Sequence, residues 1–226
     1  MAKRLLDVGL AAVALLALAP VLALAAVGIR LSSPGPIIYR ARLTGLHGAP
    51  FTMYKLRTMH LDHRGSASLI TAQRDPRVFA LGRLLRRLKI DELPQLVNVL
   101  RGDMSLVGPR PQHPDIVRRH YTPLYWEMLR VRPGLASPGS LYDSACGDAI
   151  VGSTDPEKVY VERLLPVVLA LDLVYLRHAS LRYDLAIIGR TLAYLVAVLT
   201  GRHSFPDPPE MAAALQSLRG PEAALP

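Results

Sequence analysis

The chain begins with the apolar stretch LLDVGLAAVALLALAPVLALAAV at residues 5–27, in which Asp7 is the only charged side chain. A helix needs about 20 apolar residues to cross the hydrocarbon core of a bilayer, so the stretch is long enough to be a membrane element. Basic residues flank it, with Lys3 and Arg4 before it and Arg30 after it. This stretch decides the fold, because the rest of the chain must form a domain that carries a membrane helix.

The apolar stretch has three interpretations. A secretory signal peptide also has a basic start and an apolar run, and Ala23-Leu24-Ala25 resembles a cleavage site. A single membrane-spanning anchor and a re-entrant helix that enters and leaves on the same face are the other two. Pro20 and the basic flanks favour the re-entrant form, because proline leaves segments of about 14 and about 10 residues, each too short to span. Residue patterns alone give the re-entrant and spanning forms equal weight.

Length and composition limit the classes of protein. The chain has 226 residues, enough for one domain of ordinary size beside a membrane segment. Its net charge of +9 favours anionic partners such as lipid headgroups, phosphorylated substrates or nucleic acid, although a solvated basic face without a partner has the same charge. The single cysteine, Cys146, excludes an internal disulfide framework and argues against a structural zinc site. The chain has three phenylalanines and one tryptophan, which argues against a nucleic-acid binder that stacks bases.

The remaining residues predict an α+β fold that is mainly helical. Ser33-Pro34-Gly35-Pro36 ends the membrane element with a turn, and short strands are expected at residues 37–39 and 51–55. Apolar spacing predicts amphipathic helices at residues 81–88 and 181–199, the second lying in the membrane interface or packing on the core. We therefore expect a membrane helix over residues 1–32, a small globular domain with interfacial helices over residues 33–200, and a mobile tail over residues 201–226, which contain five prolines.

Two adjacent carboxylates follow a basic segment in Lys89-Ile90-Asp91-Glu92-Leu93-Pro94-Gln95. Asp91 is expected to cap a helix that runs from Glu92 to Arg101, with Gly102 as its C-cap. An ionised aspartate beside bound phosphate can act as a nucleophile on phosphorus, and a neighbouring glutamate can ligate Mg²⁺. An acidic pair at a helix start is also a common capping arrangement with no further function.

Several cations are candidate phosphate ligands for this site. Arg110 lies in the rigid loop Gly108-Pro109-Arg110-Pro111 and could clamp a phosphate through two hydrogen bonds. The further candidates are Lys55, Arg57, Arg86 and Arg87. Arginine-rich faces are usually only solvated, so no single residue is decisive. The coincidence of a membrane element, a basic cluster, an acidic pair and a rigid arginine loop indicates phosphate chemistry at a bilayer surface.

Several of these motifs together resemble one enzyme family. The matching segments are Lys3-Arg4-Leu5-Leu6-Asp7, Ser33-Pro34-Gly35-Pro36, Tyr54-Lys55-Leu56-Arg57-Thr58-Met59, Asp75-Pro76-Arg77, Gly82-Arg83-Leu84-Leu85-Arg86, Ile90-Asp91-Glu92-Leu93-Pro94-Gln95-Leu96, the run from Asn98 to Pro111, and Arg132-Pro133-Gly134. In order and spacing over residues 3–135, and more weakly to about residue 195, the chain resembles the small bacterial polyprenyl-phosphate phosphoglycosyl transferases, also called bacterial sugar transferases.

The resemblance implies a monotopic protein on the cytoplasmic face of the bacterial inner membrane, anchored by a re-entrant helix broken at Pro20. It implies transfer of a sugar-1-phosphate from a nucleotide sugar, usually a UDP-sugar, to undecaprenyl phosphate. This transfer would release UMP and would be the first step in the synthesis of an exopolysaccharide or another cell-surface glycan. By resemblance, Asp91 attacks the sugar-proximal phosphate, Glu92 holds Mg²⁺, and Arg110 and Lys55 contact phosphate. Membrane lipids are further partners, nucleic acid is not, and the oligomeric state is left open, a homodimer included.

The chain departs from the family pattern in two places. Relatives often have Ser-Pro at the helix break, whereas this chain has Ala19-Pro20. After Gly134 many relatives continue with Gly-Trp-x-Gln-Val-x-Gly, where this chain has the segment from Leu135 to Leu141. The sugar and the nucleotide are therefore not predicted, and Asp172 and Asp184 receive no role. The alternative function is a non-catalytic, membrane-tethered basic module that binds anionic lipid or nucleic acid.

Overall fold

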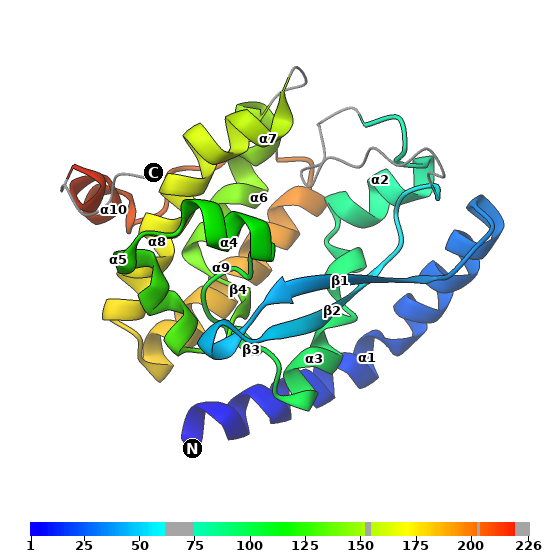
Figure 1. Ribbon diagram of the computed structural model, residues 1–226. Helices are drawn as coiled ribbons and strands as arrows, with labels where there is room; N and C mark the ends of the chain where they lie inside the picture. The colour runs from blue at the N-terminus through cyan, green and yellow to red at the C-terminus, as the bar shows by residue number, and fades with distance from the viewer. Residues whose placement is uncertain (62–74, 152–154, 203, 220–226) are drawn as a thin grey trace.

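The computed structural model describes residues 1–61, 75–151, 155–202 and 204–219, and its elements form a mainly helical fold with short strands (Figure 1). The helices are α1 (Ala2–Ser32), α2 (Ala80–Arg87), α3 (Gln95–Arg101), α4 (Pro114–His120), α5 (Pro123–Trp126), α6 (Pro138–Val151), α7 (Pro156–Val159), α8 (Leu165–Arg177), α9 (Leu181–Leu199) and α10 (Met211–Leu218). The strands are β1 (Ile38–Thr44), β2 (Pro50–Leu56), β3 (Ser105–Val107) and β4 (Gly134–Ala136). The mainly helical α+β class is confirmed.

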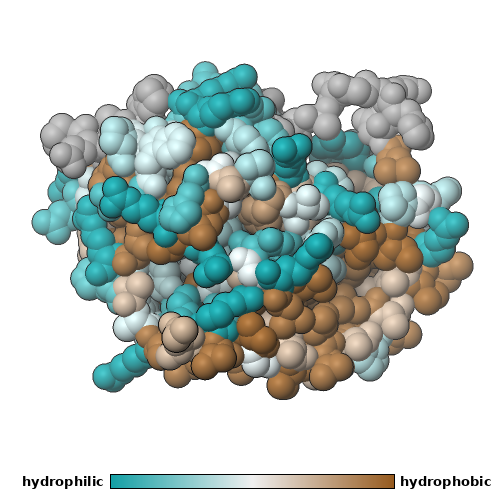
Figure 2. Space-filling model, turned by 60° about the horizontal axis from the view of Figure 1, so that its bottom comes forward, coloured by the Kyte–Doolittle hydropathy of each residue, from teal (hydrophilic) through white to brown (hydrophobic). Residues whose placement is uncertain are grey.

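Helix α1 is long and apolar enough to cross a membrane, and most of its surface is not covered by the rest of the chain. Figure 2 shows apolar side chains gathered over this side of the molecule. The expected break at Pro20 is not confirmed, because the helix continues on both sides of this residue from Ala2 to Ser32. Membrane association is therefore supported, while the re-entrant path stays a prediction.

Charged residues near the start of α1 attach the helix to the domain. Asp7 is buried, and its carboxylate accepts hydrogen bonds from the Ser105 hydroxyl (2.8 Å) and the Leu106 N–H (3.0 Å) on β3. Lys3 forms an ion pair of 2.7 Å with Asp184 on α9. Asp184, for which the sequence predicts no role, thus ties the membrane helix to α9. A charge in a membrane stretch is costly unless it is partnered, and here it serves the docking of α1 onto β3.

The two expected strands pair as the antiparallel β1–β2 hairpin, which carries Lys55 toward the acidic pair. Asn98 on α3 fixes the position of β2. Its side-chain amide donates to the Thr52 carbonyl (2.7 Å), and its oxygen accepts the Tyr54 N–H (3.0 Å). The backbone of Gly102 is left-handed, with φ of 92°, and ends α3 as predicted. The hairpin and α3 therefore form one unit that holds Lys55 opposite Glu92.

The structure corrects the prediction of a mobile tail over part of residues 201–226. Residues 211–218 form α10, which packs on α8 through the fully buried Ala214. Glu210, just before this helix, accepts hydrogen bonds from Arg190 on α9 at 2.6 and 3.0 Å. The prolines at residues 206, 208 and 209 lie before α10 and do not prevent its packing on α8, so proline content alone does not predict a mobile segment here. Residues 220–226 lie outside the described residues.

Candidate active site

The acidic pair lies in a tight turn that precedes α3. Residues Ile90–Glu92 form a single 3₁₀ turn, and Pro94, with no side-chain cap bond, occupies the N-cap position of α3. The turn closes through three-residue hydrogen bonds, in which Glu92 N–H donates to the Lys89 carbonyl and Leu93 N–H to the Ile90 carbonyl. The prediction that Asp91 caps this helix is therefore wrong. Its carboxylate is not used to satisfy a helix end.

Asp91 is a buried carboxylate with one oxygen that has no partner among the described residues. Only 7% of the residue is exposed, and its Oδ1 atom has no hydrogen-bond donor among the described residues. Burial raises the pKa of Asp91, and the negative charge of Glu92 raises it further, while Lys55 and other cations act in the opposite direction. A buried, unpaired oxygen is costly in a folded protein, so its presence here indicates a functional use.

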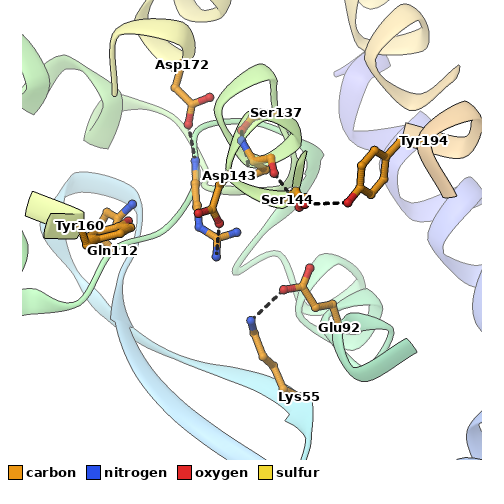
Figure 3. A network of polar contacts seen from close by, with 11 residues as sticks. Lys55, Glu92, Gln112, Ser137, Asp143, Ser144, Tyr160, Asp172 and Tyr194 are labelled. Carbon is orange, nitrogen blue, oxygen red and sulfur yellow. Dashed lines mark hydrogen bonds and ion pairs between the residues drawn. The ribbon is translucent and has the colours of Figure 1, made fainter. Parts of the chain in front are cut away.

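Glu92 has the opposite electrostatic environment. Its Oε1 atom accepts a 2.9 Å ion-pair hydrogen bond from the Lys55 ammonium (Figure 3). Burial alone would raise the pKa of Glu92, but the charges of Lys55, Lys89 and Arg110 outweigh it and hold the pKa well below its usual range. Neighbouring carboxylates whose pKa values are pushed apart are typical of sites where the two groups have different tasks.

Arg110 is held from two sides. Its guanidinium lies 3.2 Å from an Asp143 oxygen on α6, and its backbone N–H donates to Asp172 on α8 at 2.8 Å (Figure 3). Burial opposes the charge on Arg110, but Asp143 and Glu92 outweigh burial and raise its pKa, so the side chain is a permanent cation. The structure thus brings Arg110, Lys55 and Glu92 together, as the sequence predicts.

Asp172, on α8, binds the backbone of the loop that carries Arg110. It is buried and accepts N–H groups from both Arg110 and Gly139, the second at 2.9 Å. Burial raises the pKa of Asp172 to about 6, although these hydrogen bonds act in the opposite direction. A Cβ atom at Gly139 would lie 2.6 Å from the Asp172 carboxylate, so only glycine permits this approach. Gly139 belongs to the segment that departs from the family pattern. Asp172 therefore connects this segment to the loop that carries Arg110.

Asp143, Asp172 and Lys89 are the site residues that sequence reasoning missed. Asp143 lies on α6, an element that sequence reasoning did not predict, and Asp172 lies in a largely apolar helix. Only a buried charge in an apolar run, as at Asp172, could have indicated a special role. Lys89 directly precedes the acidic pair, but a lysine beside carboxylates is not itself a signal.

Arg86 and Arg87, two further predicted phosphate ligands, differ in how closely they are associated with the acidic pair. The Arg86 side chain donates to the Thr58 hydroxyl at 2.8 Å, and its charge lowers the pKa of Asp91, so it belongs to the neighbourhood of the site. Arg87 is exposed on α2. The structure therefore supports Arg86 more than Arg87 as a site residue.

Arg57 has a structural environment in place of the expected phosphate contact. It is buried, and its guanidinium donates to the Ser33 hydroxyl and carbonyl, to the Pro36 carbonyl (2.6 Å) and to the Met59 carbonyl (3.1 Å). Ser33 and Pro36 lie in the turn that follows α1, and Met59 lies just after β2. All three guanidinium nitrogens of Arg57 thus donate to protein oxygens. This favours a structural role, in which Arg57 fixes the end of α1, over phosphate binding.

Replacing Arg57 by methionine is expected to destabilise the protein by roughly 3 kcal/mol, because buried carbonyls would lose their donor. The measurement is thermal unfolding in detergent, with the exposed Arg87→Met as the matched control. The KM for a phosphorylated substrate should not change in the fraction that stays folded. A raised KM with an unchanged unfolding temperature would instead assign Arg57 to phosphate binding.

The carboxylates of this site fit a magnesium ion. No cluster of three or more His, Cys, Asp and Glu side chains that could hold a metal occurs within the described part of the chain. Mg²⁺ usually takes only one or two carboxylates and completes its shell with water and substrate phosphates. The ionised Glu92 is such a carboxylate, and substrate phosphate and water would complete the shell.

Comparisons with known proteins identify the family of this chain. A sequence model described as "Bacterial sugar transferase" matches residues 1–198. The chain is 42% identical over 197 residues to a UDP-glucose:undecaprenyl-phosphate glucose-1-phosphate transferase of Caulobacter vibrioides, covering 86% of this chain and 69% of that protein. It is 36% identical over 193 residues to a protein of the same name from Escherichia coli, covering 84% of this chain and 39% of that one. The match thus spans only part of each relative's length.

Proposed function

Because the chain belongs to the bacterial sugar transferase family, we propose that it transfers a sugar-1-phosphate from a UDP-sugar to undecaprenyl phosphate and releases UMP. The observation that carries this proposal is the buried, unpaired Asp91 carboxylate beside an ionised Glu92 and the cations Lys55 and Arg110. A basic module that only binds anions would not need such a carboxylate. The family and the acidic pair together favour catalysis.

The chemistry proceeds in two displacements at one phosphorus atom. An oxygen of Asp91 attacks the sugar-proximal phosphorus and forms an O–P bond, while the bond to the bridging oxygen breaks and UMP leaves with the electron pair. An oxygen of the lipid phosphate then attacks the same phosphorus and returns the Asp91 carboxylate. The product is a lipid diphosphate that carries the sugar.

The neighbouring residues make these displacements possible. Arg110 and Lys55 offset the negative charge of the phosphate oxygens, so that a carboxylate can approach an anion. Bound Mg²⁺, held by Glu92, would supply further charge neutralisation. Burial of Asp91 removes water from the nucleophile, which favours transfer to the lipid over hydrolysis.

The proposed setting is the cytoplasmic face of the bacterial inner membrane, with α1 as a monotopic, re-entrant anchor. The exposed apolar surface of α1 and its attachment to β3 through Asp7 support an anchor that stays close to the domain. Both substrates would meet at this surface, because the lipid phosphate lies in the membrane interface and the nucleotide sugar comes from water. The product would begin an exopolysaccharide or another cell-surface glycan.

The proposal is tested with the full chain in detergent, undecaprenyl phosphate, Mg²⁺ and a panel of UDP-sugars. UMP release that depends on one UDP-sugar, together with a lipid-linked sugar in the organic phase, is the expected result. UDP release in place of UMP would indicate transfer of the sugar without its phosphate and would contradict the mechanism.

Removal of the divalent cation is expected to abolish turnover. An excess of EDTA should lower UMP release to background, and added Mg²⁺ should restore it, because charge on the transferred phosphate would otherwise repel Asp91. Glu92→Gln should weaken binding of Mg²⁺, measured by titrating the metal against the rate. Full activity in EDTA would contradict the metal assignment without contradicting the nucleophile.

A further inference from the structure

Lys89 has a backbone conformation that a lysine rarely adopts. Its φ of 55° and ψ of 19° lie in the left-handed region, and within the described residues the other non-glycine residue with positive φ is His47, in the β1–β2 loop. This region is unfavourable for a residue with a Cβ atom, and glycine or asparagine usually fills it. Such an outlier next to a candidate nucleophile calls for a functional explanation.

The backbone of residue 89 makes two hydrogen bonds that do not require a lysine side chain. Lys89 joins α2 to the turn that carries the acidic pair; its N–H donates to the Arg86 carbonyl (3.1 Å), and its own carbonyl accepts the Glu92 N–H (3.3 Å). Glycine would make the same hydrogen bonds without strain. The presence of lysine therefore points to its side chain.

The ammonium group of Lys89 is the uncommitted cation of the site. Of the cations whose charge lowers the pKa of Glu92, Lys55 is paired with Glu92 itself and Arg110 with Asp143. The Lys89 side chain is half-buried and takes part in no hydrogen bond or ion pair with the residues that the structure describes. Its charge also lowers the pKa of Asp91, so the ammonium acts on both carboxylates.

The balance of charge indicates what Lys89 binds. Lys55 and Arg110 are each engaged by a protein carboxylate, Glu92 and Asp143, and Arg86 donates to the Thr58 hydroxyl. An incoming phosphate adds further negative charge to the same space. A cation that is already positioned and not neutralised by the protein is what such a ligand needs.

We propose that Lys89 is a phosphate-binding residue, whose ammonium group donates to a non-bridging oxygen of the phosphate facing Asp91. This inference rests on the proposed function, because it requires a phosphorylated substrate at the acidic pair. The phosphate is either that of the nucleotide sugar or that of the polyprenyl lipid. Both offer the same chemistry, and the two steps of the reaction separate them.

The test replaces Lys89 by residues that suit its backbone. Lys89→Asn and Lys89→Gly remove the charge but favour left-handed φ, so unfolding temperatures equal to or above that of the wild type are expected. Activity should fall about 10- to 100-fold, as for loss of one charged hydrogen bond. Lys89→Arg keeps the charge and should keep most of the rate. Lys158→Asn, at an exposed lysine on α7, is the matched control and should have full activity.

Two assays identify the phosphate. Single-turnover UMP release without lipid reports on the nucleotide sugar, and transfer from the loaded enzyme to undecaprenyl phosphate reports on the lipid. A raised KM or lowered rate of Lys89→Asn in either assay supports the inference and names the source. Wild-type rates in both assays would overturn it, as would a loss that higher pH fully reverses, since Lys89 would then only keep Asp91 ionised. A wild-type protein that releases no UMP would count against the proposed function itself.

Discussion

Replacing Asp91 by asparagine is expected to lower turnover by about 10⁴-fold or more, because an amide cannot take the place of the attacking carboxylate. The same change is expected to leave the protein folded and to raise its stability at neutral pH. Burial raises the pKa of Asp91, so the folded state disfavours the ionised form that the unfolded chain adopts above its ordinary pKa. A neutral side chain of the same shape removes this cost. Loss of activity with a gain in stability separates a nucleophile from a structural residue.

The measurements for Asp91→Asn are UMP release with the preferred UDP-sugar and thermal unfolding in detergent. Asp155→Asn is the matched control, because Asp155 is a true N-cap whose carboxylate accepts the Lys158 N–H at 3.1 Å. Asparagine caps a helix as well as aspartate does, so this control should retain activity and stability. Mass spectrometry of the wild type, incubated with donor but without lipid, should find the phosphosugar on Asp91. An Asp91→Asn rate near that of the wild type would remove Asp91 from the mechanism.

Local sequence patterns predicted the parts of the fold that depend on local physics. The apolar run of residues 5–27 lies within α1, and the short strands expected at residues 37–39 and 51–55 overlap β1 and β2. The apolar stripe after Pro94 became α3, and Gly102 ended it. The loop that presents Arg110 was predicted from its prolines. Each of these features depends on residues that are close together in the sequence, so it can be predicted from the sequence alone.

The features that sequence reasoning missed depend on contacts between distant segments. Arg57 was predicted to be a phosphate ligand, but its partners at Ser33 and Pro36 lie at the end of α1 and in the turn after it. Asp143 meets Arg110 only because α6 folds back over the arginine loop. The 3₁₀ turn at Asp91 is a different case, because its two hydrogen bonds join residues only three apart and nothing in the residue pattern distinguished it from a helix start. Charge and spacing do not reveal which of several possible partners a side chain will meet.

The network around Arg110 separates two tasks that are often combined in one residue. Asp172 holds the backbone N–H of Arg110, and it also holds the Gly139 N–H, so it fixes the loop whatever side chain the loop carries. Asp143 holds the guanidinium and sets its direction. The side chain of Arg110 can therefore be changed while the loop stays in place. This makes Arg110 a clean position at which to measure the effect of a phosphate-binding cation.

Arg110→Ala is expected to lower kcat/KM for the UDP-sugar by about 10² to 10³-fold with little change in unfolding temperature, because alanine keeps the N–H that Asp172 accepts. Arg110→Lys should fall between this variant and the wild type, since lysine keeps the charge but not the two-pronged contact. Asp143→Asn should lower kcat/KM about 10-fold, because the Arg110 guanidinium would lose the carboxylate that fixes its orientation. The exposed Arg118, paired with Asp115 on α4, gives the matched control Arg118→Ala, which should match the wild type. Equal kcat/KM for Arg110→Ala and Arg118→Ala would show that Arg110 supports the loop and does not bind phosphate.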